Sequence, residues 1–559
     1  MQSSASTLAD ETVPAAAAVF PPGDGDGDVF AFPLSFSQQR LWFLDQLEPG
    51  TALYNVPANL QVRGALSVAA LEQALTEIVR RHEALRTVFR LFGETPRQVV
   101  LPPAPLSLHL TDLSTQEPDA RAASLKTLIE EESNRPFDLA AGPLFRARLV
   151  RLAAEEHVLV VGMHHIVSDG WSLGILVREV RALHEAFARG LPSPLPELPL
   201  QYADVAVWQR ENLEGEVLDG QVAYWRDHLA GAPAALDLPT DRPRPALATY
   251  PGASLRTAVP LNVVDGLRAV SRAGEATLFM TLLAAWSVAL ARWSGQRDVV
   301  VGSPIAGRTY SELEELIGFF VNTLVLRARM EDDPTFAELL DRVRESTLGA
   351  YGNQDVPFER LVEELQPERD MSRAPLFQVM FLMQNMSTEG VEEEGLRIAA
   401  LPAETEAAKF DLSLAAAEKP DGLNLILQYN TDLFDAATVE RMLASFRTLL
   451  AGVAARPGQR VSRLPLLPAA ERTLVLERWN DTGRGARPEL GMHGAFELRA
   501  TETPDAVAVA WEGGSLTYGA LDADANRLAH HLRALGVGPE TLVALCTERG
   551  PRMLTALLA

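Results

Sequence analysis

Short apolar runs alternate with amphipathic helical patterns along most of the chain, and this alternation limits the folds that the chain can adopt. Residues 66–89 carry apolar side chains at helical spacing, which predicts a helix over that range. The runs at residues 157–163 and 298–305 are short and rich in β-branched residues, as is typical of buried strands. The alternation continues from Phe32 to about residue 455 and predicts an α/β or α+β class.

Length and charge exclude several classes of protein. A chain of 559 residues is too long for one hydrophobic core, so we expect several domains. Its 74 Asp and Glu residues against 50 Lys and Arg residues give a net charge of -24, the wrong sign for gripping phosphate backbones or anionic membranes. We expect no nucleic-acid partner and no membrane partner. No apolar run approaches the roughly 18 residues of a membrane span, and the N-terminus lacks a signal segment, so we expect a cytoplasmic protein.

Changes in composition divide the chain. Residues 1–30 are rich in Ala, Pro, Gly and Asp without any period, which predicts a flexible linker. Proline-rich stretches near the middle of the alternating region predict two lobes, and another near its end marks a second linker. The expected segments are an N-terminal linker (1–30), an N-lobe (31–210), a C-lobe (211–455), a linker (456–484) and a final unit (485–559).

Two smaller features invite a metal or redox interpretation. Asp24, Asp26 and Asp28 have the first spacings of a calcium-binding loop, but Val29 replaces the loop glycine and Ser35 the final glutamate. A solvated linker is therefore favoured over a calcium site. The single cysteine, Cys546, can build neither a disulfide framework nor a thiolate zinc site, and its apolar surroundings predict a buried, inert thiol.

Two adjacent histidines and an aspartate lie within residues 163–170, MHHIVSDG. A strand pattern precedes them and a helical pattern follows, so His164 and His165 should point to opposite sides of a strand's end. That arrangement argues against a two-histidine metal site. Two interpretations stay open: polar residues at an element boundary with Asp169 as a helix N-cap, or a histidine that positions a substrate or exchanges a proton near neutral pH.

Residues 164–170 also fit the HHxxxDG pattern of the condensation domains of nonribosomal peptide synthetases, and the chain resembles that family. Two residues depart from the family's motifs: Ser37 stands where Ala is usual and Asn353 where His is usual. Neither departure touches HHxxxDG. The stretches that match the family's motifs, in order, are 35–50, 81–89, 163–172, 202–210, 317–327, 353–362 and 369–378.

The resemblance implies a fold, a reaction and partners. It implies two chloramphenicol-acetyltransferase-like lobes in a V-shaped pseudo-dimer, with a tunnel between them and carrier proteins docking at opposite mouths. The implied reaction joins a donor peptidyl or aminoacyl thioester to the amine of an acceptor aminoacyl thioester. Both substrates hang on phosphopantetheine arms of donor and acceptor peptidyl carrier domains, so the chain itself is expected to bind no cofactor and no metal, and to act as a monomer. Residues 54–55 and the first motif resemble the subtype that accepts an L-configured donor.

The resemblance also implies roles for single residues. His165 is the active-site histidine facing the tunnel, and Gly170 lets the backbone approach the thioester and offers its N–H to an oxyanion. His164 and Asp169 are structural, with Asp169 pairing with an arginine of the other lobe, for which we choose Arg308. The remaining candidates for the tunnel wall are Arg86, Trp171, Ser172 and Asn322; for Arg86 a helix-surface ion pair is an equal alternative.

Residues 515–546 resemble the opening of an adenylation domain, so the final unit is expected to be a partial α/β adenylation subdomain whose remainder is a partner. The family's phosphate loop and catalytic lysine lie further on, and we do not expect this chain to activate an amino acid by itself. His530 and His531 form a second pair, but Leu535 replaces the aspartate, so they are expected on a helix surface.

Three alternative functions stay open. A starter condensation domain would transfer a fatty acyl group, and a free-standing acyltransferase would use coenzyme A. A non-catalytic recruitment domain would dock carriers or tailoring enzymes, although such relatives depart from HHxxxDG. Heterocyclization is disfavoured, because those domains carry Asp where His164 stands.

Overall fold

The computed structural model describes residues 18–20, 29–213, 215–366, 370–384, 396–401, 407–483 and 490–559. These residues form two compact units, Met1–Pro468 and Ala469–Ala559. The run at Asp24, Asp26 and Asp28 lies outside the described residues, as does most of the expected N-terminal linker. Within that linker range, β1 (Ala18–Phe20) is described and pairs with β2 (Val29–Pro33).

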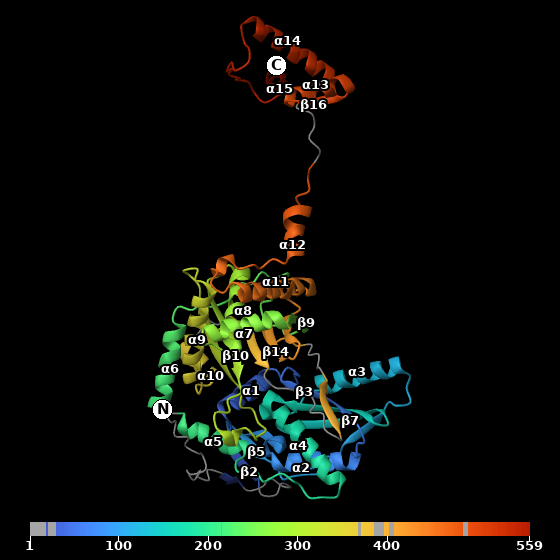
Figure 1. Ribbon diagram of the computed structural model, residues 1–559, viewed down its shortest axis with the longest axis vertical. Helices are drawn as coiled ribbons and strands as arrows, with labels where there is room; N and C mark the ends of the chain where they lie inside the picture. The colour runs from blue at the N-terminus through green and yellow to red at the C-terminus, as the bar shows by residue number, and fades with distance from the viewer. Residues whose placement is uncertain are drawn as a thin grey trace. The chain divides into compact units, whose positions relative to one another are not determined.

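The N-lobe is built on a five-stranded sheet in the order β13-β3-β8-β7-β6. Its central strand β8 is buried on both faces, which is why its sequence is almost continuously apolar. Leu159 and Val161 contact helices α2 and α4 on one face, while Val158 and Val160 face helix α3 on the other (Figure 1). The bounds are β3 (Asn55–Arg63), β6 (His109–Asp112), β7 (Phe145–Ala153), β8 (Glu156–His164), β13 (Arg397–Leu401), α2 (Val68–Arg81), α3 (Pro118–Asn134) and α4 (Gly170–Ala188).

A smaller sheet and several short elements complete this lobe. The four-stranded sheet has the order β1-β2-β5-β4. Helix α5 contacts β2 of this sheet, and α1 contacts η3, the short turn that follows β8. The bounds are α1 (Phe36–Leu47), η2 (Glu83–Arg86), β4 (Thr87–Phe92), β5 (Thr95–Val100), η3 (His165–Val167) and α5 (Tyr202–Asn212).

The C-lobe is built on a six-stranded sheet in the order β11-β10-β12-β14-β15-β9. Helices α7, α8, α9 and α11 pack on it, and α8 is buried along most of its length because its sequence is apolar on all sides (Figure 1). The bounds are α6 (Glu216–Leu229), β9 (Gly252–Pro260), α7 (Leu261–Ala273), α8 (Leu278–Ser294), β10 (Asp298–Ile305), η4 (Ser311–Leu313), β11 (Asn322–Arg329), α9 (Phe336–Gly352), α10 (Phe358–Leu365), β12 (Val379–Gln384), β14 (Leu412–Lys419), β15 (Gly422–Asn430), α11 (Ala436–Ala455) and η5 (Val461–Arg463).

One strand crosses between the lobes. β13 comes from the C-lobe half of the sequence but forms the edge of the N-lobe sheet, where Ala399 faces Gln61 of β3 in antiparallel register. The chain then returns to the C-lobe to form β14. The expected C-lobe segment 211–455 therefore also supplies part of the N-lobe.

The helix predicted over residues 66–89 is too long. α2 ends at Arg81, and residues 87–89 belong to strand β4. The helix stops because His82 leaves the helical conformation and uses both ring nitrogens in buried tertiary contacts with Glu179 and Ile317. By contrast, the strand predicted at 298–305 has those bounds in β10.

Residues 456–468, expected to begin a linker, pack on the first unit. Arg460 forms a bridge with Thr335, and Val461 and Leu464 are buried in the C-lobe core. Beyond Pro468 the second unit contains α12 (Ala469–Thr473), η6 (Leu474–Arg478), α13 (Met492–Glu502), β16 (Val507–Trp511), β17 (Gly514–Thr517), α14 (Tyr518–Ala534) and α15 (Pro551–Leu558).

The expected environment of Cys546 is wrong. The cysteine is exposed, and residues 542–546 form no strand although the run is apolar. β16 and β17 pair only with each other in the described part of the chain, so this run has no strand to join. His530 and His531 lie exposed on α14, as expected.

Across the described residues, no single helix is both long and apolar enough to cross a membrane. The bent pair α7 and α8, at 104° to each other, meets that criterion on length and composition alone.

Gly302 on β10 tests how tightly the C-lobe core is packed. A Cβ atom there would lie 2.2 Å from Cε2 of Phe377, so Gly302→Ala must displace a buried ring. We expect it to lower the free energy of unfolding by about 1–3 kcal/mol, measured by urea denaturation with tryptophan fluorescence. Gly352→Ala is the matched control, because nothing lies within 4 Å of its new Cβ. Equal stability of the two variants would contradict the packing described here.

Candidate active site

A cavity of about 3270 Å³ lies between the two lobes of the first unit. Its wall takes residues from both lobes, including His165 and Gly170 from the N-lobe and Asn322, Met380 and Lys409 from the C-lobe segment. A volume of this size exceeds that of an ordinary small-molecule pocket, which is about 300–1,000 Å³. The space suits two extended substrates better than one small one.

His165 lines this cavity at the point where β8 ends. Its backbone N–H donates to the carbonyl of Tyr54 at 2.8 Å, and its ring packs edge-on against Phe319 at 4.8 Å between centroids. Nδ1 lies 2.9 Å from the carbonyl oxygen of Ser168, which can only accept, so Nδ1 carries the proton. Nε2 of the neutral ring therefore holds a lone pair, and it can accept a hydrogen bond or a proton.

The surroundings of His165 favour its neutral form. Burial, and then the positive charge of Lys409, lower the pKa of His165 to about 4, against the weaker opposing effect of Asp169. A neutral imidazole is the form that can orient an amine through a hydrogen bond and take up its proton.

His164 is buried away from the cavity, so the two histidines separate as expected for neighbours at a strand's end. Its Nδ1 accepts the backbone N–H of Ile166 at 3.1 Å, and its ring lies near the rings of Tyr54 and Phe137. Burial, followed by the charges of His165 and Lys409, lowers the pKa of His164 to about 3. His164 therefore stabilises the turn that carries His165.

Asp169 is the N-cap of helix α4 and forms a capping box with Ser172. Oδ1 accepts the backbone N–H of Ser172 at 2.8 Å and its hydroxyl at 2.8 Å, while the hydroxyl accepts the N–H of Asp169 at 3.3 Å. The helix N-terminus favours a negative charge at this position. The N-cap interpretation of Asp169 is therefore correct, but it is only part of what the carboxylate does.

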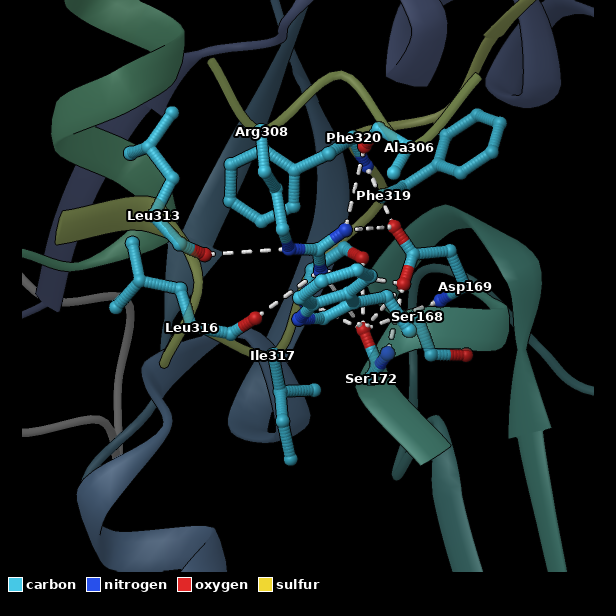
Figure 2. Close-up of polar contacts among 12 residues, drawn as sticks. Ser168, Asp169, Ser172, Ala306, Arg308, Leu313, Leu316, Ile317, Phe319 and Phe320 are labelled. Carbon is cyan, nitrogen blue, oxygen red and sulfur yellow. Dashed lines mark hydrogen bonds and ion pairs between the residues drawn. The ribbon is translucent and has the colours of Figure 1, made fainter. Parts of the chain in front are cut away.

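Arg308, the arginine that we chose for Asp169, reaches it from the C-lobe (Figure 2). Nη1 lies 2.8 Å from Oδ2 and Nη2 lies 3.2 Å from Oδ1, and both side chains are almost fully buried. The guanidinium also donates to the carbonyls of Leu313 and Leu316 and packs over the ring of Phe320. Ion pair and helix cap thus form one cluster that holds the loop of residues 306–320 against the N-lobe.

The other expected site residues divide into two groups. Gly170 lines the cavity, nothing lies within 4 Å of a Cβ built on it, and its N–H belongs to the open N-terminus of α4. Trp171 also lines the cavity and donates from Nε1 to the carbonyl of Glu314 at 2.9 Å. Asn322 lines it too, but its amide binds the backbone of Gln354, Val356 and Phe358, so it positions α10.

Two expected tunnel residues do not reach the cavity wall. Ser172 is fully buried, because its hydroxyl is used in the capping box and by Gly318 of the C-lobe loop. Arg86 lies on η2, where it donates to the carbonyl of Leu101 and pairs with Glu83 at 3.1 Å. Arg86 thus forms the local ion pair of the alternative interpretation, although on η2 and not on the helix α2.

Sequence reasoning missed a second buried contact to the same loop. His82 donates from Nε2 to Glu179 of α4 at 3.0 Å and accepts the N–H of Ile317 on Nδ1 at 3.3 Å. Arg81 forms an ion pair with the same carboxylate, with its Nη2 3.3 Å from Oε1 of Glu179. The motif at residues 81–89 was recognisable, but nothing local indicated a partner so distant in sequence. No cluster of three or more His, Cys, Asp or Glu side chains within the described ranges could hold a metal ion.

Comparisons with known proteins agree with this geometry. Residues 31–476 match the family model described as "Condensation domain", and residues 496–559 match "AMP-binding enzyme". A linear gramicidin synthase of Brevibacillus parabrevis is 47% identical over 94% of this chain, which spans 7% of that protein. Phosphinothricin tripeptide synthetase PhsC of Streptomyces viridochromogenes is 43% identical over 96% of the chain, which spans 49% of that protein.

Solved structures show the same architecture. The X-domain from teicoplanin biosynthesis has a TM-score of 0.71 at 31% identity, and the match covers 81% of this chain and 100% of that one. A four-domain nonribosomal peptide synthetase bound to AMP and glycine has a TM-score of 0.77 at 24% identity, covering 92% of this chain and 40% of that one. The expected class, an α/β fold of two chloramphenicol-acetyltransferase-like lobes, is confirmed.

Asp169→Asn tests the buried ion pair. Asparagine keeps the size and caps helices equally well, but it leaves Arg308 buried without its charge partner. We expect a loss of roughly 3–5 kcal/mol in the free energy of unfolding by urea denaturation, partly recovered by adding Arg308→Met. The control is Glu130→Gln, which removes the exposed pair with Lys126 and should cost less than about 1 kcal/mol. A loss as small as that of the control would contradict the role of the pair.

The lowered pKa of His165 makes stability depend on pH. Its folded pKa of about 4 lies below the ordinary value of 6.5, so the unfolded chain binds a proton that the folded protein does not. We expect the contribution of a neutral His165 to the free energy of unfolding to be complete above pH 6.5 and lost as the pH falls from 6.5 to about 4. Urea denaturation of wild type and His165→Gln over that range measures it, together with the change that losing His165 causes in the pKa of His164. Parallel pH profiles for the two proteins would show that the folded pKa is not lowered.

Proposed function

The chain belongs to the condensation-domain family of nonribosomal peptide synthetases, and from this membership we propose that it forms an amide bond between two carrier-bound thioesters. The acceptor is an aminoacyl group and the donor a peptidyl or aminoacyl group, each on the phosphopantetheine arm of a partner carrier domain. The observation that carries the proposal is His165, whose unprotonated Nε2 belongs to a neutral ring on the wall of a cavity shared by both lobes.

The reaction needs little from the protein as a base. The acceptor nitrogen attacks the donor carbonyl carbon, the carbon–oxygen π electrons move to oxygen, and the carbon–sulfur bond then breaks as the carbonyl re-forms. The nitrogen loses one proton and the leaving thiolate gains one, so the products are an amide and a free thiol. A free α-amine has a pKa of about 7.7–8.0, so much of it is already neutral near pH 7.

Positioning is therefore the larger contribution. Holding two reactants in the correct geometry contributes roughly 7–11 kcal/mol in favourable cases, whereas a positioned acid or base gives about 10²- to 10⁴-fold. In our proposal, Nε2 of His165 accepts a hydrogen bond from the amine. This hydrogen bond orients the nitrogen lone pair toward the donor, and Nε2 then takes up the proton. The N–H of Gly170, at the open N-terminus of α4, donates to the oxyanion.

The donor subtype is part of the proposal. Residues 54–55 and the first motif favour an L-configured donor residue over a D-configured one. Residues 496–559 match the AMP-binding model only in part, so we propose that the remainder of an adenylation domain acts beside this chain. The chain spans 7% to 10% of the first relatives that it matches, so their products are not assigned to it.

A second candidate follows from the likeness to the X-domain at 31% identity, whose solved complex is with OxyB. By analogy, the chain would bind a tailoring enzyme without forming a bond. The complete HHIVSDG sequence and the Nδ1–H tautomer of His165 favour catalysis over this recruitment role.

His165→Ala tests the proposed function. Donor and acceptor carriers, loaded with a peptidyl or aminoacyl group and an aminoacyl group, are mixed with the chain, and product on the acceptor is followed by intact mass. We expect product from wild type and a loss of about 10²-fold or more in the variant at unchanged melting temperature. His531→Ala, exposed on α14, is the matched control and should keep full activity.

The same assay separates the alternatives. Product only from a fatty-acyl donor would replace the proposal with the starter function. Carrier binding without product from any donor would replace it with recruitment.

A further inference from the structure

Lys409 is one of the charged groups on the wall of the cavity that holds His165. It lies in the C-lobe segment just before β14, and its Nζ lies 4.5 Å from the ring centroid of Tyr54 in the N-lobe. The carbonyl of that same Tyr54 accepts the backbone N–H of His165 at 2.8 Å. Tyr54 thus contacts both groups: its backbone carbonyl binds His165, and its ring faces the ammonium of Lys409.

The backbone around Lys409 is held firmly by the C-lobe. Ala408 donates its N–H to Tyr250 at 2.8 Å, and Asp411 donates its N–H to Gln378 at 3.0 Å. The carboxylate of Asp411 pairs with Arg244, and the ring of Phe410 stacks on a neighbouring phenylalanine. These anchors on both sides fix where the lysine side chain enters the cavity.

Lys409 forms no ion pair with any carboxylate of the described residues, although Asp169, Glu359 and Asp411 line the same cavity. Each of these carboxylates already has its own arginine: Asp169 has Arg308, Glu359 has Arg40 at 3.0 Å and Asp411 has Arg244. Burial, and then the charge of Arg40, lower the pKa of Lys409 to about 8, so the ammonium persists at neutral pH. A half-buried cation over an aromatic ring without a carboxylate is poised to attract negative charge from a bound molecule.

We propose that Lys409 supplies positive charge to the reaction chamber, where it stabilises the negative charge that develops on the donor thioester and adds to burial in favouring a neutral His165. This inference rests on the proposed function. When the acceptor nitrogen attacks, the carbonyl π electrons move to oxygen, and the ammonium lowers the energy of that oxyanion together with the N–H of Gly170. When the carbon–sulfur bond breaks, the same charge stabilises the departing thiolate, while His165 Nε2 holds the proton from nitrogen.

A cation beside His165 also has a consequence that needs no substrate. The charge of Lys409 lowers the pKa of both His164 and His165. The groups facing Lys409 are Arg40 of α1, Tyr54 before β3 and the two histidines at the end of β8. None of these groups is an unpaired anion that the ammonium neutralises. Replacing Lys409 with a neutral residue should therefore raise the pKa of both histidines.

The test compares Lys409→Met and Lys409→Arg with wild type in the loaded-carrier assay, from pH 6.5 to pH 9.5. We expect about a 10²-fold lower rate for Lys409→Met at pH 7.5 and substantial rescue by Lys409→Arg. The wild-type rate should fall above pH 8 as the ammonium loses its proton, whereas Lys409→Arg should keep its rate to pH 9.5. Lys126→Met, which removes an exposed lysine on α3, is the matched control.

A second measurement is independent of turnover. Histidine titration by NMR on selectively labelled protein should place the His165 transition at higher pH in Lys409→Met than in wild type. The melting temperature of each variant, compared with that of wild type, shows that the fold is kept.

The outcomes separate the two proposals. Wild-type activity that Lys409→Met retains at every pH, or that Lys409→Arg fails to rescue, overturns the role of Lys409 and leaves the proposed function standing. An inactive wild type overturns the proposed function and the thioester role with it. An unshifted His165 titration in Lys409→Met overturns the remaining role, that of adding to burial in favouring a neutral His165.

Discussion

The buried ion pair between Asp169 and Arg308 is the contact on which the site depends. A buried pair stabilises a fold only when its remaining hydrogen-bonding positions are also filled, and here they are. The Asp169 carboxylate accepts from Arg308, Ser172 and the backbone of Phe320, and the guanidinium also donates to carbonyls of its own loop. Because Asp169 also begins α4, the contact that joins the lobes also places the N–H of Gly170 and the turn of His165.

The loop of residues 306–320 is the C-lobe's side of that contact, and it is held at several points along one helix, two of them buried. Asp169 and Ser172 bind it at the start of α4, and His82, held by Glu179 further along the same helix, binds Ile317. Both contacts are buried, so moving the loop would expose several polar groups at once. The cavity wall that His165 shares with Phe319 is therefore set by α4 as a whole.

Local sequence patterns predicted the elements that carry the site, and contacts distant in sequence explain most of what they missed. β8, β10 and α4 follow from apolar periodicity, and the HHxxxDG resemblance pointed to His165, Asp169 and Arg308. The early end of α2 depends on the partners of His82, and the exposure of Cys546 depends on a sheet that offers no further strand. Lys409 was missed because a single lysine before an apolar strand has no local signature; its significance comes from Tyr54, which lies in the other lobe.

The strand β13 also decides where this polypeptide tolerates being divided. A cut at the proline-rich boundary near residue 210 looks natural in the sequence, yet it would separate β3 from the strand that covers its edge. The N-lobe fragment would then carry an unpaired row of backbone donors and acceptors, which is a template for association with other chains. For exchanging parts between synthetases, the smallest transferable piece of the first unit is thus both lobes together, with residues 456–468 that pack on the second of them.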